Sequence, residues 1–156
     1  MKNKKVLFVC LGNICRSPAA HGILEHLAGD TVEVESAGTS AYHEGERADP
    51  RMRTAAKNRG IELNSISQGF KTSDFQYYDY IITMDNSNFQ NIKNLDPNGQ
   101  YESKIIKMVD FLSDKYADVE EIPDPYFGGD QGFEFVLDLL DDGCKKLLNK
   151  IEKGEI

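Results

Sequence analysis

The stretch VCLGNICRSP, Val9 to Pro18, joins the first apolar run of the chain to its first segment with helical periodicity. Residues Val6 to Cys10 are apolar without interruption, which predicts a strand covered on both faces. Ser17 and Pro18 are residue types favoured at a helix start, so we expect Ser17 to be the N-cap and Pro18 the first helical residue. A strand, a tight turn and a helix N-terminus therefore follow one another directly.

Three further segments have the composition of strands. The alternating residues 31–38 and the mostly apolar residues 79–85 and 104–109 predict strands two to four. The helical segments expected around them are a helix that ends at Gly29, a helix between Asp49 and Gly60, a turn capped by Thr72, a helix at residues 87–95 and a last helix whose apolar stripe runs from Phe133 to Ile151.

Strands that alternate with helices indicate an α/β protein whose parallel sheet is wound by right-handed crossovers. We therefore expect a three-layer Rossmann-like (flavodoxin-like) fold, with a four-stranded parallel sheet and helices on both faces. Residues 1–156 contain no linker-like run, which predicts a single domain. Ligands of such sheets bind beyond the carboxyl ends of the strands. The loops expected at that edge are residues 9–17, 35–43, 83–87 and 121–129.

The net charge of -8 argues against a nucleic-acid partner, because nucleic-acid binding depends on a basic surface. It also disfavours an anionic membrane surface, and no segment is long enough to span a bilayer. The apolar run after Lys5 is too short for a signal peptide. The odd count of 3 cysteines fits a reducing compartment, so we predict a cytoplasmic protein, and we expect it to be a monomer.

The loop between the first strand and the first helix has the features of an anion cradle. Gly12 permits a tight turn, and the helix N-terminus adds backbone N–H groups and a positive dipole. Arg16 can bind two oxygens of a tetrahedral dianion with its planar fork. A helix N-terminus and an arginine favour the thiolate form of a cysteine, so we expect Cys10 to be a nucleophile aimed at a bound phosphorus.

The motif C-x5-R-S, Cys10 to Ser17, together with Asp124-Pro-Tyr126 far downstream, resembles the low-molecular-weight protein tyrosine phosphatases. The resemblance covers nearly the whole chain. It implies a metal-independent phosphatase without cofactors that hydrolyses phosphotyrosine in proteins, and small aryl phosphates, through a phosphocysteine intermediate. Inorganic phosphate is then both the product and an inhibitor.

The resemblance also implies a role for each matching residue. Cys10 is the nucleophile, Arg16 the phosphate clamp and Asp124 the general acid. Cys10 and Cys15 are expected to form a reversible disulfide under peroxide. The phosphate-binding loop comprises Leu11, Gly12, Asn13, Ile14, Cys15, Arg16 and Ser17. Among the residues that support the loop, Ser17 stabilises the Cys10 thiolate, and Asn13 orders the loop with help from Ser36. The aromatic slot is lined by Leu11, Tyr42 and Tyr126.

Two residues depart from the family pattern. Phe127 stands where the family often has a second tyrosine, and Ser65 stands where some members have a histidine that supports the loop. Asp85 ends the third predicted strand at the functional edge. Its role is open: it either anchors the loops through Arg16 or caps the next helix.

Other functions remain to be weighed against this one. Cys10, Cys15, His21 and His26 give a short C-x4-C-x5-H-x4-H series, but its spacing does not match a zinc finger, and we expect both histidines on solvated helix surface. Arsenate reduction needs two further cysteines, and only Cys144 remains, on an apolar stripe where it should be buried. A catalytically dead phosphotyrosine-binding module would usually lack Cys10, Arg16 or Asp124.

Overall fold

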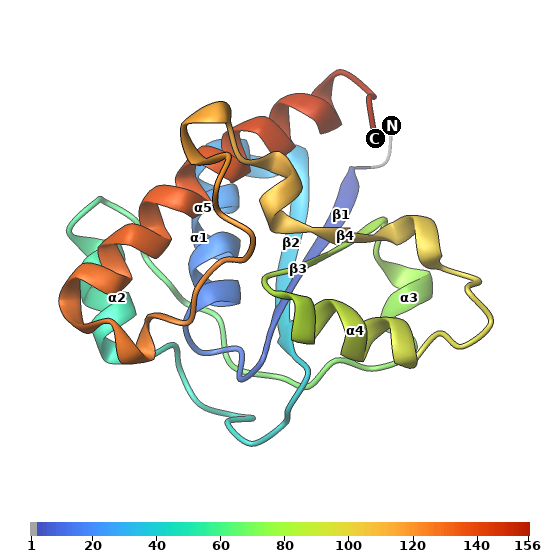
Figure 1. The fold of residues 1–156 in the computed structure, drawn as a ribbon, viewed down its shortest axis with the longest axis horizontal. Coiled ribbons are helices and arrows are strands. Elements are labelled where there is room, and N and C mark those ends of the chain that lie inside the picture. The colour runs from blue at the N-terminus through green and yellow to red at the C-terminus, as the bar shows by residue number, and fades with distance from the viewer. Residues whose placement is uncertain (1–2) are drawn as a thin grey trace.

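The centre of the molecule is a four-stranded parallel sheet with the strand order β2-β1-β3-β4 (Figure 1). The computed structural model describes residues 3–156, except for the side chain of Phe127. The parallel four-stranded sheet with helices packed on both faces confirms the predicted fold class. The strands are β1 (Lys4–Cys10), β2 (Val32–Gly38), β3 (Tyr80–Thr83) and β4 (Ile105–Lys107).

Helices follow the strands as the periodicity predicts, with small differences at their ends. Across the described residues no helix combines the length and the apolar composition needed to cross a membrane. The helices are α1 (Arg16–Ala28), α2 (Pro50–Lys57), α3 (Asp74–Tyr77), α4 (Asn86–Asn94) and α5 (Gly129–Glu152), and the 3-10 turns are η1 (Gly29–Thr31), η2 (Glu102–Lys104), η3 (Met108–Phe111), η4 (Asp114–Tyr116) and η5 (Pro125–Phe127).

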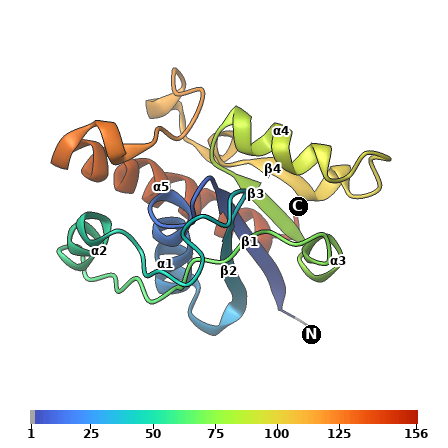
Figure 2. The same ribbon diagram turned by 90° about the horizontal axis from the view of Figure 1, so that it is seen from below.

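Two hydrophobic clusters lie on opposite faces of the sheet. Phe8 and Ile82 belong to the cluster under α1, α2 and α5, whereas Leu7 and Ile81 belong to the cluster under α3 and α4 (Figure 2). Successive side chains of a strand point to opposite faces, so one apolar run fills both clusters. Burial on both faces explains why β1 contains no polar residue between Val6 and Cys10.

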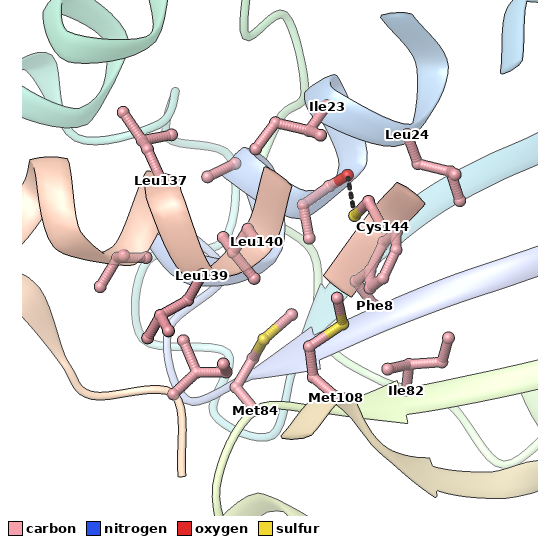
Figure 3. Packing of buried hydrophobic residues seen from close by; sticks show 14 of the residues in the cluster. Phe8, Ile23, Leu24, Ile82, Met84, Met108, Leu137, Leu139, Leu140 and Cys144 are labelled. Carbon is pink, nitrogen blue, oxygen red and sulfur yellow. Dashed lines mark hydrogen bonds between the residues drawn. The ribbon is translucent and has the colours of Figure 1, made fainter. Parts of the chain in front are cut away.

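The larger cluster packs the long helix α5 against α1 and the sheet (Figure 3). Cys144 on α5 is fully buried there, and its Sγ lies 3.8 Å from the carbonyl oxygen of Ala20 on α1. Burial raises the pKa of the Cys144 thiol above its usual range. Cys144 is thus the buried small hydrophobe that its place on the apolar stripe predicts.

The loops after β1 and β2 are hydrogen-bonded to each other at the carboxyl edge of the sheet. Backbone N–H groups of Thr39 and Ser40 donate to the carbonyl oxygens of Cys10 and Leu11 at 2.9 Å in both cases. A Cβ at Gly38 would lie 2.8 Å from the Leu11 and Ser40 carbonyl oxygens, so only glycine fits this junction. The two loops are therefore held against each other beside the position between β1 and β3 where the strand order reverses.

Two predicted helix caps are wrong. Helix α1 begins at Arg16 with Cys15 at the N-cap position and without a side-chain cap, because the Ser17 hydroxyl faces Cys10 and Asn13 instead. Helix α3 has Ser73, not Thr72, at its N-cap. The first error has a structural reason, since the Ser17 hydroxyl contacts Cys10 and Asn13 and is therefore not available as a cap.

Candidate active site

A cavity of about 600 Å³ opens at the carboxyl end of β1. It brings together residues from the loops after β1 and β2 and from the segment before α5, three parts of the chain that are far apart in sequence. Its lining residues are Cys10, Leu11, Gly12, Ile14, Cys15, Arg16, Ser40, Tyr42, His43, Asp124 and Tyr126.

The Cys10 sulfur lies at the base of this cavity, 3.0 Å from the Ser17 Oγ atom. Asn13 Nδ2 donates a hydrogen bond of 2.8 Å to the same Ser17 oxygen. Because this oxygen already accepts from Asn13, its own proton is left to point at Cys10 or at the Ala37 carbonyl oxygen, which is 3.5 Å away. The shorter contact favours donation to sulfur, which stabilises a thiolate.

Asn13 holds the loop in a left-handed conformation, with φ 57°. Its Oδ1 atom accepts a hydrogen bond of 3.0 Å from the backbone N–H of Gln68. A backbone N–H can only donate, so this contact determines which end of the Asn13 amide faces Ser17. Asn13 therefore connects Ser17 to a segment about 55 residues further along the chain.

The backbone N–H groups of Gly12 to Cys15 face no protein acceptor within residues 3–156. They lie between the strand end and the first turn of α1, which begins at Arg16 without a side-chain cap. Unpaired N–H groups and a helix N-terminus attract an anion with several acceptor oxygens. The loop thus has the donors for a bound phosphate.

Arg16 is only 4% exposed. Its Nη1 atom donates to Asp85 Oδ2 at 2.7 Å and to the Ile122 carbonyl oxygen at 3.0 Å. Burial by itself lowers the pKa of Arg16, but the adjacent Cys10 charge and the hydrogen bond to Asp85 outweigh burial and raise it. In the described part of the chain no acceptor is bound by Nε or Nη2, so both remain for phosphate oxygens.

Asp85 makes both of the contacts between which the sequence left a choice. Its Oδ2 atom binds Arg16, and its Oδ1 atom accepts a hydrogen bond of 2.7 Å from the backbone N–H of Asn88 as the N-cap of α4. One carboxylate, two residues after the end of β3, therefore caps α4 and orients the arginine.

Ser67 and Gln68, rather than Ser65, provide the contacts to the loop from the segment after α2. Ser67 Oγ donates to the Gly12 carbonyl oxygen at 2.9 Å, and Gln68 Nε2 donates to the Ser36 carbonyl oxygen at 3.0 Å. The sequence analysis did not identify either residue. No local pattern marks them, because their role depends on a contact across about 55 residues of chain.

The expectation that His21 lies on solvated surface is wrong, whereas His26 is exposed as expected. His21 is 8% exposed and places Nδ1 3.2 Å from Ser36 Oγ. Ser36 therefore bonds to α1 and to Gln68, and it contacts Asn13 only through Gln68. Ser36 of β2 packs against this face of α1, a contact that the helical periodicity alone does not reveal.

Asp124 lines the same cavity as Cys10. Its side chain is exposed, and its Oδ1 atom accepts a hydrogen bond of 3.0 Å from the backbone N–H of Tyr126. The mouth of the cavity is flanked by the exposed side chains of Leu11, Tyr42 and Tyr126. The Phe127 side chain lies outside the described residues.

Cys15 lines the same cavity, but its sulfur is in a different environment. Burial and the nearby charges of Asp49 and Cys10 raise the pKa of the Cys15 thiol to about 12. Cys15 therefore stays protonated at neutral pH. Within residues 3–156 no group of three or more His, Cys, Asp or Glu side chains is arranged to hold a metal ion.

Comparison with known proteins gives consistent results over nearly the full chain. A sequence model described as "Low molecular weight phosphotyrosine protein phosphatase" matches residues 5–155. The protein of that name from Schizosaccharomyces pombe is 39% identical over 156 residues, covering 96% of this chain and 98% of its own.

Solved structures superpose closely. A protein tyrosine phosphatase from Entamoeba histolytica with Hepes in the active site has a TM-score of 0.92 and 46% identity, covering 99% of this chain and 100% of its own. A Drosophila arginine phosphatase has a TM-score of 0.83 and 32% identity, covering 93% and 96% of the two chains.

Proposed function

Because the chain belongs to the low molecular weight phosphotyrosine protein phosphatase family, we propose that it hydrolyses phosphotyrosine in proteins, and small aryl phosphates, through a phosphocysteine intermediate. The observation that carries the proposal is that Cys10, Arg16 and Asp124 line one cavity. A nucleophile, a cation for the phosphate oxygens and an acid for the leaving group are the three parts that the reaction needs.

In the first step the Cys10 thiolate attacks phosphorus in line with the ester oxygen. The S–P bond forms as the P–O bond breaks, and Asp124 transfers its proton to the departing phenolate oxygen. A positioned acid contributes about 10²–10⁴ to the rate of such a step. The tyrosine product leaves, and Asp124 is left as a carboxylate.

In the second step a water molecule attacks the phosphocysteine. Asp124 now takes a proton from that water, the S–P bond breaks, and inorganic phosphate and the Cys10 thiolate are released. Ser17 stabilises the thiolate as the leaving group through the contact of 3.0 Å. The product is also an inhibitor, because it occupies the same cradle.

Arg16 and the loop N–H groups hold the phosphate oxygens in both steps. One nitrogen of the Arg16 fork is held by Asp85, which leaves Nε and Nη2 to bind two oxygens in parallel. Donors that are already in place cost no reorganisation when charge develops in the transition state.

The slot favours a phosphorylated aromatic ring. Leu11, Tyr42 and Tyr126 are 51%, 84% and 57% exposed and flank the mouth, so a ring that passes between them keeps apolar contacts while its phosphate reaches Cys10. A phosphoserine side chain is too short to use these walls. The substrate class is therefore phosphotyrosine, and a proposed cytoplasmic location agrees with a reaction that needs a reduced thiol.

We also propose a redox role for Cys15, which protects the nucleophile Cys10 by forming a reversible disulfide with it. Peroxide converts Cys10 to a sulfenic acid with release of water, and attack by the Cys15 sulfur then forms a disulfide and releases a second water. Both cysteines are reduced and line the same cavity. Thiols should restore activity in the wild type and not in Cys15→Ser after peroxide treatment; equal recovery in both would contradict this role.

The proposed activity is tested by steady-state hydrolysis with wild type, Cys10→Ser and Asp124→Ala. The substrates are phosphotyrosine, phosphoserine, phosphoarginine and p-nitrophenyl phosphate, the third because an arginine phosphatase shares the fold. We expect turnover of the two aryl phosphates by the wild type, none by Cys10→Ser, and phosphotyrosine preferred over phosphoarginine. Normal turnover by Cys10→Ser, or a preference for phosphoarginine, would refute the proposal.

A further inference from the structure

Arg51 connects the phosphate-binding loop to the start of α2. The Asp49 backbone N–H donates to the Ile14 carbonyl oxygen at 2.7 Å, and the Asp49 side chain caps α2 by accepting from the Arg51 backbone N–H. The same carboxylate receives two bonds from the guanidinium, from Nε at 3.2 Å and from Nη2 at 3.1 Å. The orientation of the Arg51 side chain is therefore set by a residue bonded to the loop.

The guanidinium lies against two aromatic rings from the segment that follows Asp124. The Cζ atom is 5.1 Å from the centroid of Tyr126 and 4.8 Å from the centroid of Phe133. Phe133 is 1% exposed and belongs to α5, so it provides a fixed platform. A planar guanidinium binds ring faces well, and here it lies against one ring from the short turn η5 and one from the long helix α5.

Tyr126 in turn is bonded to the proposed acid. Its backbone N–H donates to Asp124 Oδ1 at 3.0 Å, so the positions of the ring and the carboxylate are coupled within one turn. A general acid must lie within hydrogen-bond distance of the oxygen that it protonates, and small displacements reduce its effect.

We propose that Arg51 is a positioning residue that docks the turn carrying Asp124 and Tyr126 onto the phosphate-binding loop through Asp49. Arg51 does not line the catalytic cavity; it lines a second cavity of about 380 Å³, together with Phe133 of α5. It acts through the acid and touches no reacting atom. This inference rests on the proposed phosphatase function and adds a determinant of leaving-group protonation.

The test measures kcat/KM for phenyl phosphate, a poor leaving group that needs the acid, and for p-nitrophenyl phosphate, a good one. The variants are Arg51→Gln and Arg51→Lys, each in the wild-type and in the Asp124→Ala background. Arg59→Gln is the matched control, because Arg59 lies just after α2 and also binds α5, through Glu134 and Asp138, but does not line the catalytic cavity. Thermal unfolding of every variant reports stability separately.

Arg51→Gln should lower kcat/KM for phenyl phosphate about 10- to 100-fold, the order expected for a displaced catalytic group, and change p-nitrophenyl phosphate much less. In the Asp124→Ala background it should change neither, because its effect passes through the missing carboxylate. Arg51→Lys should lie between, since an ammonium keeps the charge and loses the fork.

Three results would overturn the proposal: equal losses on both substrates, the same loss without Asp124, or the same substrate dependence in Arg59→Gln. A wild type without Cys10-dependent turnover would instead refute the proposed function itself, and this inference with it.

Discussion

Arg16 and Asp85 form a charge-assisted hydrogen bond of 2.7 Å at the point where β3 ends. The Arg16 side chain is 5% exposed and that of Asp85 20%, so solvent screens this pair only partly. The same carboxylate caps α4, so one residue both stabilises the start of the helix and orients Arg16.

Replacing Asp85 by Asn separates these two contacts. Asn caps a helix about as well as Asp, so α4 should stay intact while Arg16 loses its charged partner. Such hydrogen bonds contribute about 1.5–3 kcal/mol, so kcat/KM for aryl phosphates should fall about 10- to 100-fold. Steady-state kinetics and phosphate inhibition measure the loss; Asp85→Ala should additionally lower the unfolding temperature. Unchanged kinetics in Asp85→Asn would show that Arg16 needs no anchor.

Substitutions of Asn13 separate its backbone conformation from its side-chain contacts. Asn13→Gly and Asn13→Ala both lose the bonds to Ser17 and from Gln68, but only alanine must hold φ 57° with a Cβ. The left-handed conformation costs about 1–2 kcal/mol with a Cβ, so the alanine variant should be less stable by about that amount. Urea unfolding measures the difference. Equal stabilities would mean that the loop relaxes in both variants.

Cys15 should make folding stability fall at alkaline pH. Its pKa is raised from the model-peptide range to about 12 in the folded state, so the unfolded chain loses this proton first as the pH rises. Its contribution is fully present below the unfolded pKa and declines above it. Between pH 8 and pH 10 the wild type should lose about 1 kcal/mol more unfolding free energy than Cys15→Ala. Urea unfolding with reductant present tests this, and parallel pH profiles would contradict it.

Gly38 should tolerate no side chain. An added Cβ would lie 2.8 Å from two backbone oxygens, those of Leu11 and Ser40, neither of which can rotate away. We expect Gly38→Ala to lose about 1–3 kcal/mol of stability, as overpacked sites do, and to displace the loop above Cys10. Gly69→Ala is the control, because its Cβ would first meet Ala41 at 3.4 Å. Thermal unfolding and kcat should change in the first variant and hardly in the second.

Local sequence patterns were enough to predict most of the fold and to identify the candidate reacting groups. The apolar run Val6 to Cys10 predicted β1, and the alternation of strands and helices predicted the parallel sheet. Cys10, Arg16 and Asp124 were identified by type and spacing, with the family resemblance, and the structure places all three on one cavity. Their catalytic roles remain predictions until the variants are assayed.

The predictions for Ser17 and His21 were wrong because each side chain binds a partner outside helix α1. Ser17 has the right type for an N-cap, but its hydroxyl is taken by Cys10 and Asn13. His21 lies on a face of α1 that the periodicity leaves polar, yet Ser36 of β2 packs against it. In both cases a hydrogen-bond partner outside the helix outweighs the local preference: the preceding loop for Ser17 and β2 for His21.

The sequence by itself determined which chemistry this protein carries, because periodicity and residue type are local properties that specify strands, helix starts and a nucleophile beside an arginine. Only the tertiary structure decided how that chemistry is held in place. The contacts of Ser67 and Gln68 with the loop, of Asp85 with Arg16 and of Arg51 with Tyr126 join segments far apart in the chain. Such contacts form only when the sheet brings the carboxyl ends of its strands together.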